Sequence, residues 1–202
     1  PMEGITGHTF RRVHAECFGA LDRCYTPFLA PPHVGSGFGK KAFKEIDPKN
    51  NQGLNVVPQL LTRNVDEFVW AAQVLAELGY AEVNLNLGCP SGTVVAKGRG
   101  SGFLRDLGEL EEFLQDVCER SPIAVSVKTR LGLVEDREYR QILDLYCRLP
   151  LAELIVHPRE VLCVGAVLLV PQAFFRVVDE QRPVMAFILH ADEVLPTHAA
   201  RD

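Results

Sequence analysis

Short apolar segments alternate with segments of helical periodicity along most of this chain, and that alternation limits the folds it can adopt. The apolar runs have the length of strands and occupy residues 24–29, 55–61, 82–87, 123–127 and 153–156. The segments in which apolar residues recur at helical spacing are 64–79, 106–117 and 136–147. Strands that alternate with helices of this length form βαβ units, whose strands are parallel. The alternation therefore predicts an α/β fold.

The predicted helices begin and end at recognisable capping residues. Asn64 precedes one helical segment, and Glu67, three residues later, completes the pattern of a capping box. Gly79 stands where that helix is expected to end, and Asp106 stands at the start of the next. We also expect a helix over residues 174–185 that leads into a further strand.

A doubly wound sheet and a (β/α) barrel both satisfy this alternation. No G-x-G-x-x-G motif follows a predicted strand, so the dinucleotide-binding fingerprint of the doubly wound fold is absent. We therefore predict a parallel (β/α) TIM-type barrel. A complete barrel of this type usually needs about 250 residues. The chain has 202 residues, which is short for a complete barrel.

Charge and cysteine content narrow the functional classes. Lys and Arg number 21 against 26 Asp and Glu, a net charge of -5, so any RNA contact must come from a local patch. Six cysteines occur without a C-x-x-C pair or zinc-ligand spacing. The sequence shows no secretory signal and no apolar run of about 18 residues. We expect reduced thiols, mostly in the core, in a cytoplasmic protein without a metal or a membrane span.

Polar residues recur at the carboxyl ends of the predicted strands. They are Gln59 on the second apolar run, Asn86, Gly88 and Cys89 after the third, Lys128 and Arg130 after the fourth, and His157 and Arg159 after the fifth. Active sites of α/β barrels lie at this end of the strands. We therefore predict that these side chains converge on one mouth.

Each of these residues also has a structural interpretation. Cys89 lies on a turn before Pro90, where a thiol can transfer a proton or act as a nucleophile, or can fill space as a small apolar residue. Lys128 can face an anion or extend to the barrel rim. His157 can bind a phosphate or ring oxygen, or be a satisfied, half-buried histidine. Gln59 can equally be a surface amide.

A glycine-rich loop over residues 94–102 is a separate candidate. Lys97 and Arg99 lie among its glycines, so cations and backbone amides there can meet RNA phosphates. The loop does not match the phosphate-binding motif G-x-x-x-x-G-K-[ST]. An ordinary solvated loop fits the same residues.

Several segments in order resemble the dihydrouridine synthases. They are Pro1–Thr6 (PMEGIT), Phe10-Arg11, Pro58–Leu60 (PQL), Asn84–Pro90 (NLNLGCP), Lys97–Leu104 (KGRGSGFL), Val125–Gly132 (VSVKTRLG) and Ile155–Arg159 (IVHPR). The N-x-G-C-P segment followed by V-K-x-R-x-G is the most specific part. The resemblance covers residues 1 to 159.

The resemblance implies an FMN-binding α/β barrel followed by a small helical domain that helps to hold tRNA. In that family NADPH reduces the flavin, and a hydride passes from flavin N5 to C6 of a uracil ring while a cysteine gives a proton to C5. The matching cysteine is Cys89, and Asn86 matches the residue that contacts the uracil. The target base must leave its stack to reach the flavin.

The remaining matches imply the cofactor site. Pro1 and Met2 match the segment that lies against the flavin ring, and Gln59, Lys128 and His157 match flavin contacts. Arg130 is a candidate for a flavin or substrate contact. A cation near the flavin would stabilise the anionic reduced ring.

The chain departs from the family pattern at both ends. Pro1 falls where the first strand should be ending, and residues 160–171 have no clear equivalent. Residues 186–192 stand in place of the expected Asn-Gly-Asp turn that helps to bind the FMN phosphate. By this resemblance we expect residues 1–202 to form a partial barrel that is incomplete at both ends, with the helical tRNA-binding domain absent.

Two other functions remain compatible with the sequence. One is a different FMN barrel oxidoreductase that acts on a small pyrimidine-like substrate. The other is an inactive fragment that binds RNA or a partner protein without catalysis. The oligomeric state, and NADPH rather than NADH as reductant, are not determined by the residues themselves.

Overall fold

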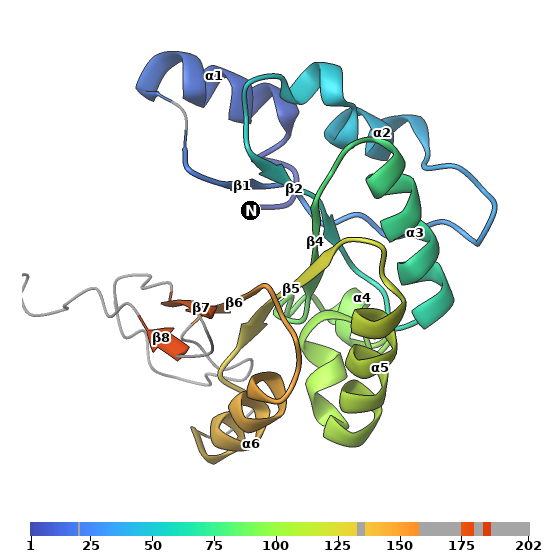
Figure 1. Ribbon diagram of the computed structural model, residues 1–202, viewed down its shortest axis with the longest axis vertical. Coiled ribbons are helices and arrows are strands. Elements are labelled where there is room, and N and C mark those ends of the chain that lie inside the picture. Colours follow the sequence, from blue (N-terminus) through green and yellow to red (C-terminus); the bar gives the residue numbers. More distant parts are fainter. Residues whose placement is uncertain (20, 133–135, 158–174, 180–183, 187–202) are drawn as a thin grey trace, which may run out of the picture.

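The computed structural model describes residues 1–19, 21–132, 136–157, 175–179 and 184–186. It contains two sheets flanked by helices (Figure 1). A two-stranded sheet pairs β1 (Cys24–Tyr25) with β2 (Val56–Val57), in parallel. The larger sheet has the order β3-β4-β5-β6-β7-β8. Its first four strands are β3 (Gln59–Leu60), β4 (Glu82–Asn86), β5 (Ala124–Arg130) and β6 (Glu153–His157).

The strands β3 to β6 are parallel neighbours in chain order, as the alternation predicts. The helices that connect them are α3 (Val65–Glu77), α5 (Leu107–Arg120) and α6 (Asp136–Cys147). Two short helical turns, α4 (Gly92–Val95) and η2 (Gly100–Arg105), lie between β4 and α5. The described strands form an open sheet, which is consistent with the predicted incomplete barrel.

The expected strand over residues 55–61 is divided at Pro58. Proline has no backbone N–H to donate to a neighbouring strand. The residues before it pair with β1, and the residues after it pair with β4 in the larger sheet. A single apolar run thus contributes to both sheets.

The segment 175–179 is a correction to the sequence analysis. We expected a helix over 174–185, but residues Phe175–Asp179 form strand β7, antiparallel to β6. Strand β8 (Val184–Ala186) pairs antiparallel with β7. Val177 and Val178 are β-branched and favour a strand. Pro183 disfavours continuation of a helix, and the open edge of β6 offers backbone partners.

Two helices before β3 were not predicted from the sequence. They are α1 (His8–Phe18) and α2 (Lys40–Ile46), the latter followed by the turn η1 (Pro48–Asn51). Neither shows a side-chain N-cap: Gly7 and Gly39 precede them, which removes the signal used to find the others.

The core lies between the larger sheet and helices α3, α5 and α6. Side chains alternate across a strand, so odd-numbered residues of β4 and β5, such as Val83, Leu85 and Val127, face the helices. Phe68 of α3 and Phe113 of α5 meet edge to face, with ring centroids 6.1 Å apart. The even-numbered residues of these strands face the other side of the sheet, and many of them are polar.

The cap of α3 differs in part from the predicted capping box. Asn64 Oδ1 accepts a hydrogen bond from the Glu67 N–H at 2.9 Å, as expected. The Glu67 carboxylate instead accepts from Thr62 Oγ1 at 2.8 Å, and that same hydroxyl oxygen accepts from the Asn64 N–H at 3.1 Å. Thr62 therefore links the two halves of the cap.

Replacement of Asn64 with alanine is expected to lower the free energy of unfolding by about 1 kcal/mol, because the first turn of α3 loses its side-chain acceptor. Urea denaturation followed by circular dichroism measures the change. Gln73→Ala, an exposed change within the same helix, is the control and should leave stability nearly unaltered. Equal midpoints for Asn64→Ala and the control would show that the cap does not stabilise the fold.

Candidate active site

A row of buried amides crosses the polar side of the sheet. Gln59 pairs in register with Asn84, and Asn84 with Ser126. The Asn84 amide donates to Ser126 Oγ at 2.9 Å, and Gln59 Nε2 donates to Asn84 Oδ1 at 2.8 Å. Asn86 Nδ2 then donates to Gln59 Oε1 at 2.8 Å. All four residues are buried, so these bonds satisfy groups that would otherwise be costly to desolvate.

The same row holds the turn that carries Cys89. Asn86 Oδ1 accepts hydrogen bonds from the Gly88 N–H at 3.1 Å and the Cys89 N–H at 2.9 Å. The Cys89 carbonyl accepts from the N–H and the hydroxyl of Ser101, at 3.1 and 2.9 Å. The turn is therefore fixed through backbone groups, which leaves the half-buried thiol available at the surface of the site.

Gly100 is required where the loop returns to this turn. Its φ is +56°, and a Cβ at this position would lie 2.7 Å from the Cys89 carbonyl oxygen. From the sequence, the glycine-rich run is a candidate either for RNA contact or for an ordinary solvated loop. In the structure Gly100 and Ser101 support the cysteine turn, a role that the G-S-G spacing alone does not reveal.

One pocket gathers all eight residues that the sequence analysis proposed for the site. Its volume is about 470 Å³, and it lies at the carboxyl ends of β3 to β6. The predicted residues that line it are Pro1, Met2, Gln59, Asn86, Cys89, Lys128, Arg130 and His157. They are joined by Glu3, Thr6, Pro27, Phe28, Gly88 and Pro90. Parallel pairing explains the convergence, because Asn86 faces Lys128 and Arg130 faces His157 in register.

Two cations stand side by side on β5 at this pocket. Burial lowers the pKa of Lys128, and the charge of Arg130 lowers it further. Arg130 Nε donates to the Gly88 carbonyl at 2.5 Å, which ties β5 to the cysteine turn. Two neighbouring positive charges in a partly buried mouth favour an anionic or electron-rich ligand.

Hydrogen bonds within the segment from Pro1 to Thr6, and one from Arg11, hold this segment along the pocket. Met2 and Thr6 exchange hydrogen bonds: the Met2 N–H donates to Thr6 Oγ1 at 2.8 Å, and that hydroxyl donates to the Met2 carbonyl at 3.1 Å. Arg11 Nη1 donates to the Thr6 carbonyl at 3.0 Å. The chain between Met2 and Thr6 therefore keeps a fixed curve along one wall.

A partly buried ionic cluster lies at the opposite, amino-terminal ends of the strands and was not found from the sequence. Arg23, just before β1, forms ion pairs with Glu82 of β4 at 3.0 Å and with Glu153 of β6. Tyr25 donates to Glu153 at 2.6 Å. The cluster links the first strand to strands far along the chain, and its position suits stability rather than catalysis.

Other predicted residues fall outside the pocket. Lys97 and Arg99 belong to the segment around α4 and η2 and do not line it, and Arg159 lies outside the described residues. Residues 96–99 lie between α4 and η2, and the RNA contact of Lys97 and Arg99 stays a prediction.

The cysteines differ from the expectation of a mostly core location. Those at 17, 24, 89, 118 and 147 are free thiols, but only Cys24 is buried; Cys163 lies outside the described residues. Burial raises the pKa of Cys118 to about 11, so that thiol stays protonated at neutral pH. No metal-ligand group, and no helix long and apolar enough to cross a membrane, occurs within the described parts of the chain.

Parallel strands that end at a polar, thiol-bearing pocket are typical of the α/β-barrel class of folds. Within that class the chain belongs to the dihydrouridine synthase family, whose model matches residues 1–173.

Among its relatives is the probable tRNA-dihydrouridine synthase 2 of Bacillus subtilis, 29% identical over 159 residues. The probable tRNA-dihydrouridine synthase of Staphylococcus aureus (strain COL) is 30% identical over 165 residues. Each alignment covers 79% of this chain and 48% of the relative. The chain therefore spans about half the length of the curated relatives it matches.

Proposed function

We propose that this chain carries the cofactor and uracil sites of an FMN-dependent reduction of uridine to 5,6-dihydrouridine in tRNA. The observation that carries the proposal is the convergence of a thiol, an amide and two cations on one pocket, in a chain of the dihydrouridine synthase family. Relatives that are named probable tRNA-dihydrouridine synthases support the same reaction. We propose that the reductant is NADPH and that the reaction takes place in the cytoplasm.

The residues of the pocket fit a flavin ring. Lys128 and Arg130 offer positive charge to the ring edge that becomes electron-rich on reduction, and His157 and Gln59 add polar contacts to its carbonyl and nitrogen atoms. Gln59 has one amide oxygen and one amide hydrogen committed to its neighbours, so its second N–H is the group available to a ligand. Pro1 and Met2 supply an apolar wall.

Bound FMN supplies the hydride for C6 of the uracil. Cys89 supplies the proton for C5, because a thiol held on a rigid turn at the pocket surface can reach a planar base stacked in the mouth. The negative charge of a Cys89 thiolate raises the pKa of Lys128, against the lowering by burial.

Asn86 would act on the uracil in part through Cys89. Both acceptor positions of its Oδ1 bind the backbone of the cysteine turn, and one Nδ2 hydrogen binds Gln59. Only the second Nδ2 hydrogen is available to a substrate oxygen. We therefore propose that Asn86 both donates to the base and fixes the position of the thiol.

The substrate base must leave its stack, so unmodified tRNA with accessible loops is the appropriate substrate. The first test is the visible absorption spectrum of the purified protein, with and without added FMN, after gel filtration. We expect bound flavin, followed by dihydrouridine formation in tRNA, detected by mass spectrometry. Reduction of a free pyrimidine with none of tRNA would instead favour a small-molecule oxidoreductase.

Lys128→Gln is expected to weaken FMN binding about tenfold, because the ring loses a charge-assisted hydrogen bond to one of its acceptor atoms. Fluorescence titration of the apoprotein with FMN measures the change. Lys97→Gln removes an exposed lysine outside the pocket and is the control. Equal affinity in both variants would contradict the assignment of Lys128, and a wild-type protein that ignores FMN would contradict the proposed function.

A further inference from the structure

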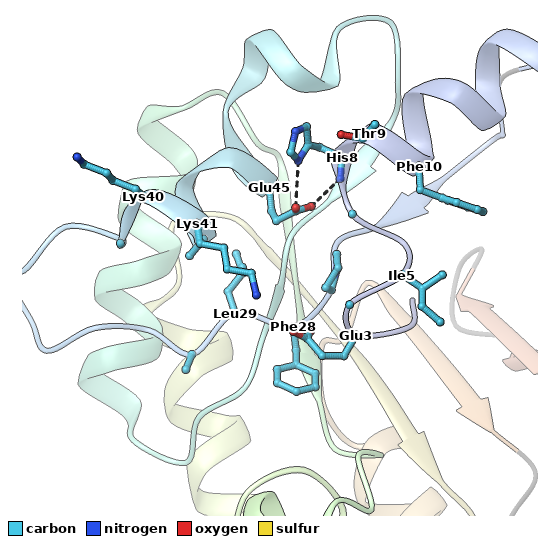
Figure 2. Close-up of a pocket in the computed structure, with 16 residues that line it drawn as sticks. Glu3, Ile5, His8, Thr9, Phe10, Phe28, Leu29, Lys40, Lys41 and Glu45 are labelled. Atoms are coloured by element: carbon cyan, nitrogen blue, oxygen red, sulfur yellow. Dashed lines mark hydrogen bonds and ion pairs between the residues drawn. The ribbon is translucent and has the colours of Figure 1, made fainter.

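A second and larger pocket lies beside the candidate active site. It has a volume of about 710 Å³ and is formed by the start of α1, by α2 and by the segment 27–30 (Figure 2). None of the eight proposed site residues lines it, but the two pockets share Glu3, Pro27 and Phe28. A volume of this size exceeds the need of a single ion and is typical of pockets for organic ligands.

The charges of this pocket favour an anionic ligand. Glu45 lies in its wall, but its carboxylate accepts hydrogen bonds from the His8 N–H at 2.8 Å and from Arg11 Nη1 at 3.0 Å. Arg11 is buried, so its charge compensates that carboxylate at close range. Lys41 extends its amino group toward Leu29 and Phe28 (Figure 2). Within the described residues, Lys41 forms no ion pair.

The rest of the lining provides an apolar wall and a second polar group. Phe28, Leu29 and Ile5 form apolar surface, and an aromatic face of this kind can hold a flat ring or a sugar edge. Glu3 stands at the border shared with the candidate active site. A carboxylate in such a position can accept hydrogen bonds from sugar hydroxyls, as in dinucleotide sites. The pocket thus presents Lys41, then the apolar wall, and then Glu3 at its border with the candidate active site.

We infer that this pocket binds the phosphate-bearing end of the nicotinamide dinucleotide that reduces the flavin, with a phosphate on Lys41. The ligand would pass Glu3 and Phe28, so that its nicotinamide ring enters the candidate active site across the shared wall. The inference deepens the proposed function and rests on it for the identity of the reductant. A nucleotide of the tRNA has similar chemistry, and the experiment separates the two.

The test is a calorimetric titration of the FMN-treated protein with NADP⁺, which carries the phosphates but cannot donate a hydride. Lys41→Gln is expected to weaken binding about tenfold, since one charge-assisted contact to phosphate is lost. Lys44→Gln is the matched control, because Lys44 lies on the same helix and outside the pocket lining. The control should bind NADP⁺ as the wild type does.

Binding of unmodified tRNA to the same variants, measured by fluorescence anisotropy at one salt concentration, completes the experiment. A loss of tRNA binding in Lys41→Gln, with NADP⁺ binding intact, would assign the lysine to RNA and overturn the inference. A wild-type protein that retains flavin but does not bind NADP⁺ would also overturn the inference. The proposed function would then stand without this pocket. A protein that binds NADP⁺ through Lys41 but never retains flavin would support the pocket and contradict the proposed function.

Discussion

Replacement of Cys89 with alanine is expected to slow uridine reduction by a factor of about 10²–10⁴, the usual contribution of a positioned proton donor. Flavin binding should be nearly unchanged, because the cysteine turn is fixed by the backbone N–H and carbonyl of residue 89 and not by the thiol. Asn86 and Ser101 keep these bonds in the variant. Mass spectrometry of the tRNA product measures the rate, and the visible spectrum measures the flavin.

Two further variants separate chemistry from packing at this position. Cys89→Ser keeps the size of the side chain but replaces the thiol with a much weaker acid, so it should lose most of the activity as well. Cys147→Ala removes an exposed thiol outside the pocket and should retain full activity. If Cys89→Ala reduced uridine as fast as the wild type, Cys89 would not be the proton donor.

Replacement of Arg11 with methionine is expected to have the largest effect on stability, a loss of about 3–5 kcal/mol. The guanidinium is buried and donates to the Thr6 carbonyl, to Glu45 and to Asn51 Oδ1, with distances of 2.9 to 3.0 Å. Methionine fills similar space but leaves the Glu45 carboxylate without its cation. Urea denaturation of the wild type and the variant measures the difference.

Arg12→Met is the matched control for this experiment. Its side chain is 62% exposed and its ion pair with Glu16 is 3.5 Å long, so the change should stay within about 0.5 kcal/mol. The double variant Arg11→Met, Glu45→Gln should recover part of the loss, because no unpaired charge remains. Equal stability of Arg11→Met and Arg12→Met would show that the buried contacts of Arg11 do not support the fold.

The Arg11 variant also has a consequence for the active site. Loss of the bond to the Thr6 carbonyl frees the segment that carries Met2 along the pocket wall. We expect weaker retention of FMN in Arg11→Met than in Arg12→Met, even where both are folded. That comparison tests whether Arg11 positions the segment that carries Met2 or only stabilises the core.

The order of the parallel strands, and the gathering of the polar residues in one pocket, could be predicted from the sequence because both begin with local signals. The apolar runs before Asn86, Lys128 and His157 alternate with helices of regular apolar spacing, two of which begin at the caps Asn64 and Asp106. Parallel strands place their carboxyl ends at one edge, so residues at those ends meet whatever the exact strand limits are. The family resemblance implied roles for individual residues, which periodicity alone cannot indicate.

Other features depend on contacts between segments distant in the chain. Helices α1 and α2 lack polar caps, and the amide row from Ser126 to Asn86 joins residues 42 and 27 positions apart. Strand β7 was expected as a helix, because the local sequence does not reveal that β6 has a free edge with which this segment can pair. Such pairings are decided by which partner is within reach after the chain has folded.

The sequence by itself determined a parallel α/β architecture, the family and the set of polar residues at the strand ends, because periodicity and short motifs are properties of neighbouring residues. Only the tertiary structure decided how those residues support one another. It showed that Asn86 and Ser101 hold the cysteine turn, that Arg11 compensates Glu45, and that a second pocket adjoins the first. Each of these depends on distances across the fold, which hydrogen bonding and burial set only when the segments pack together.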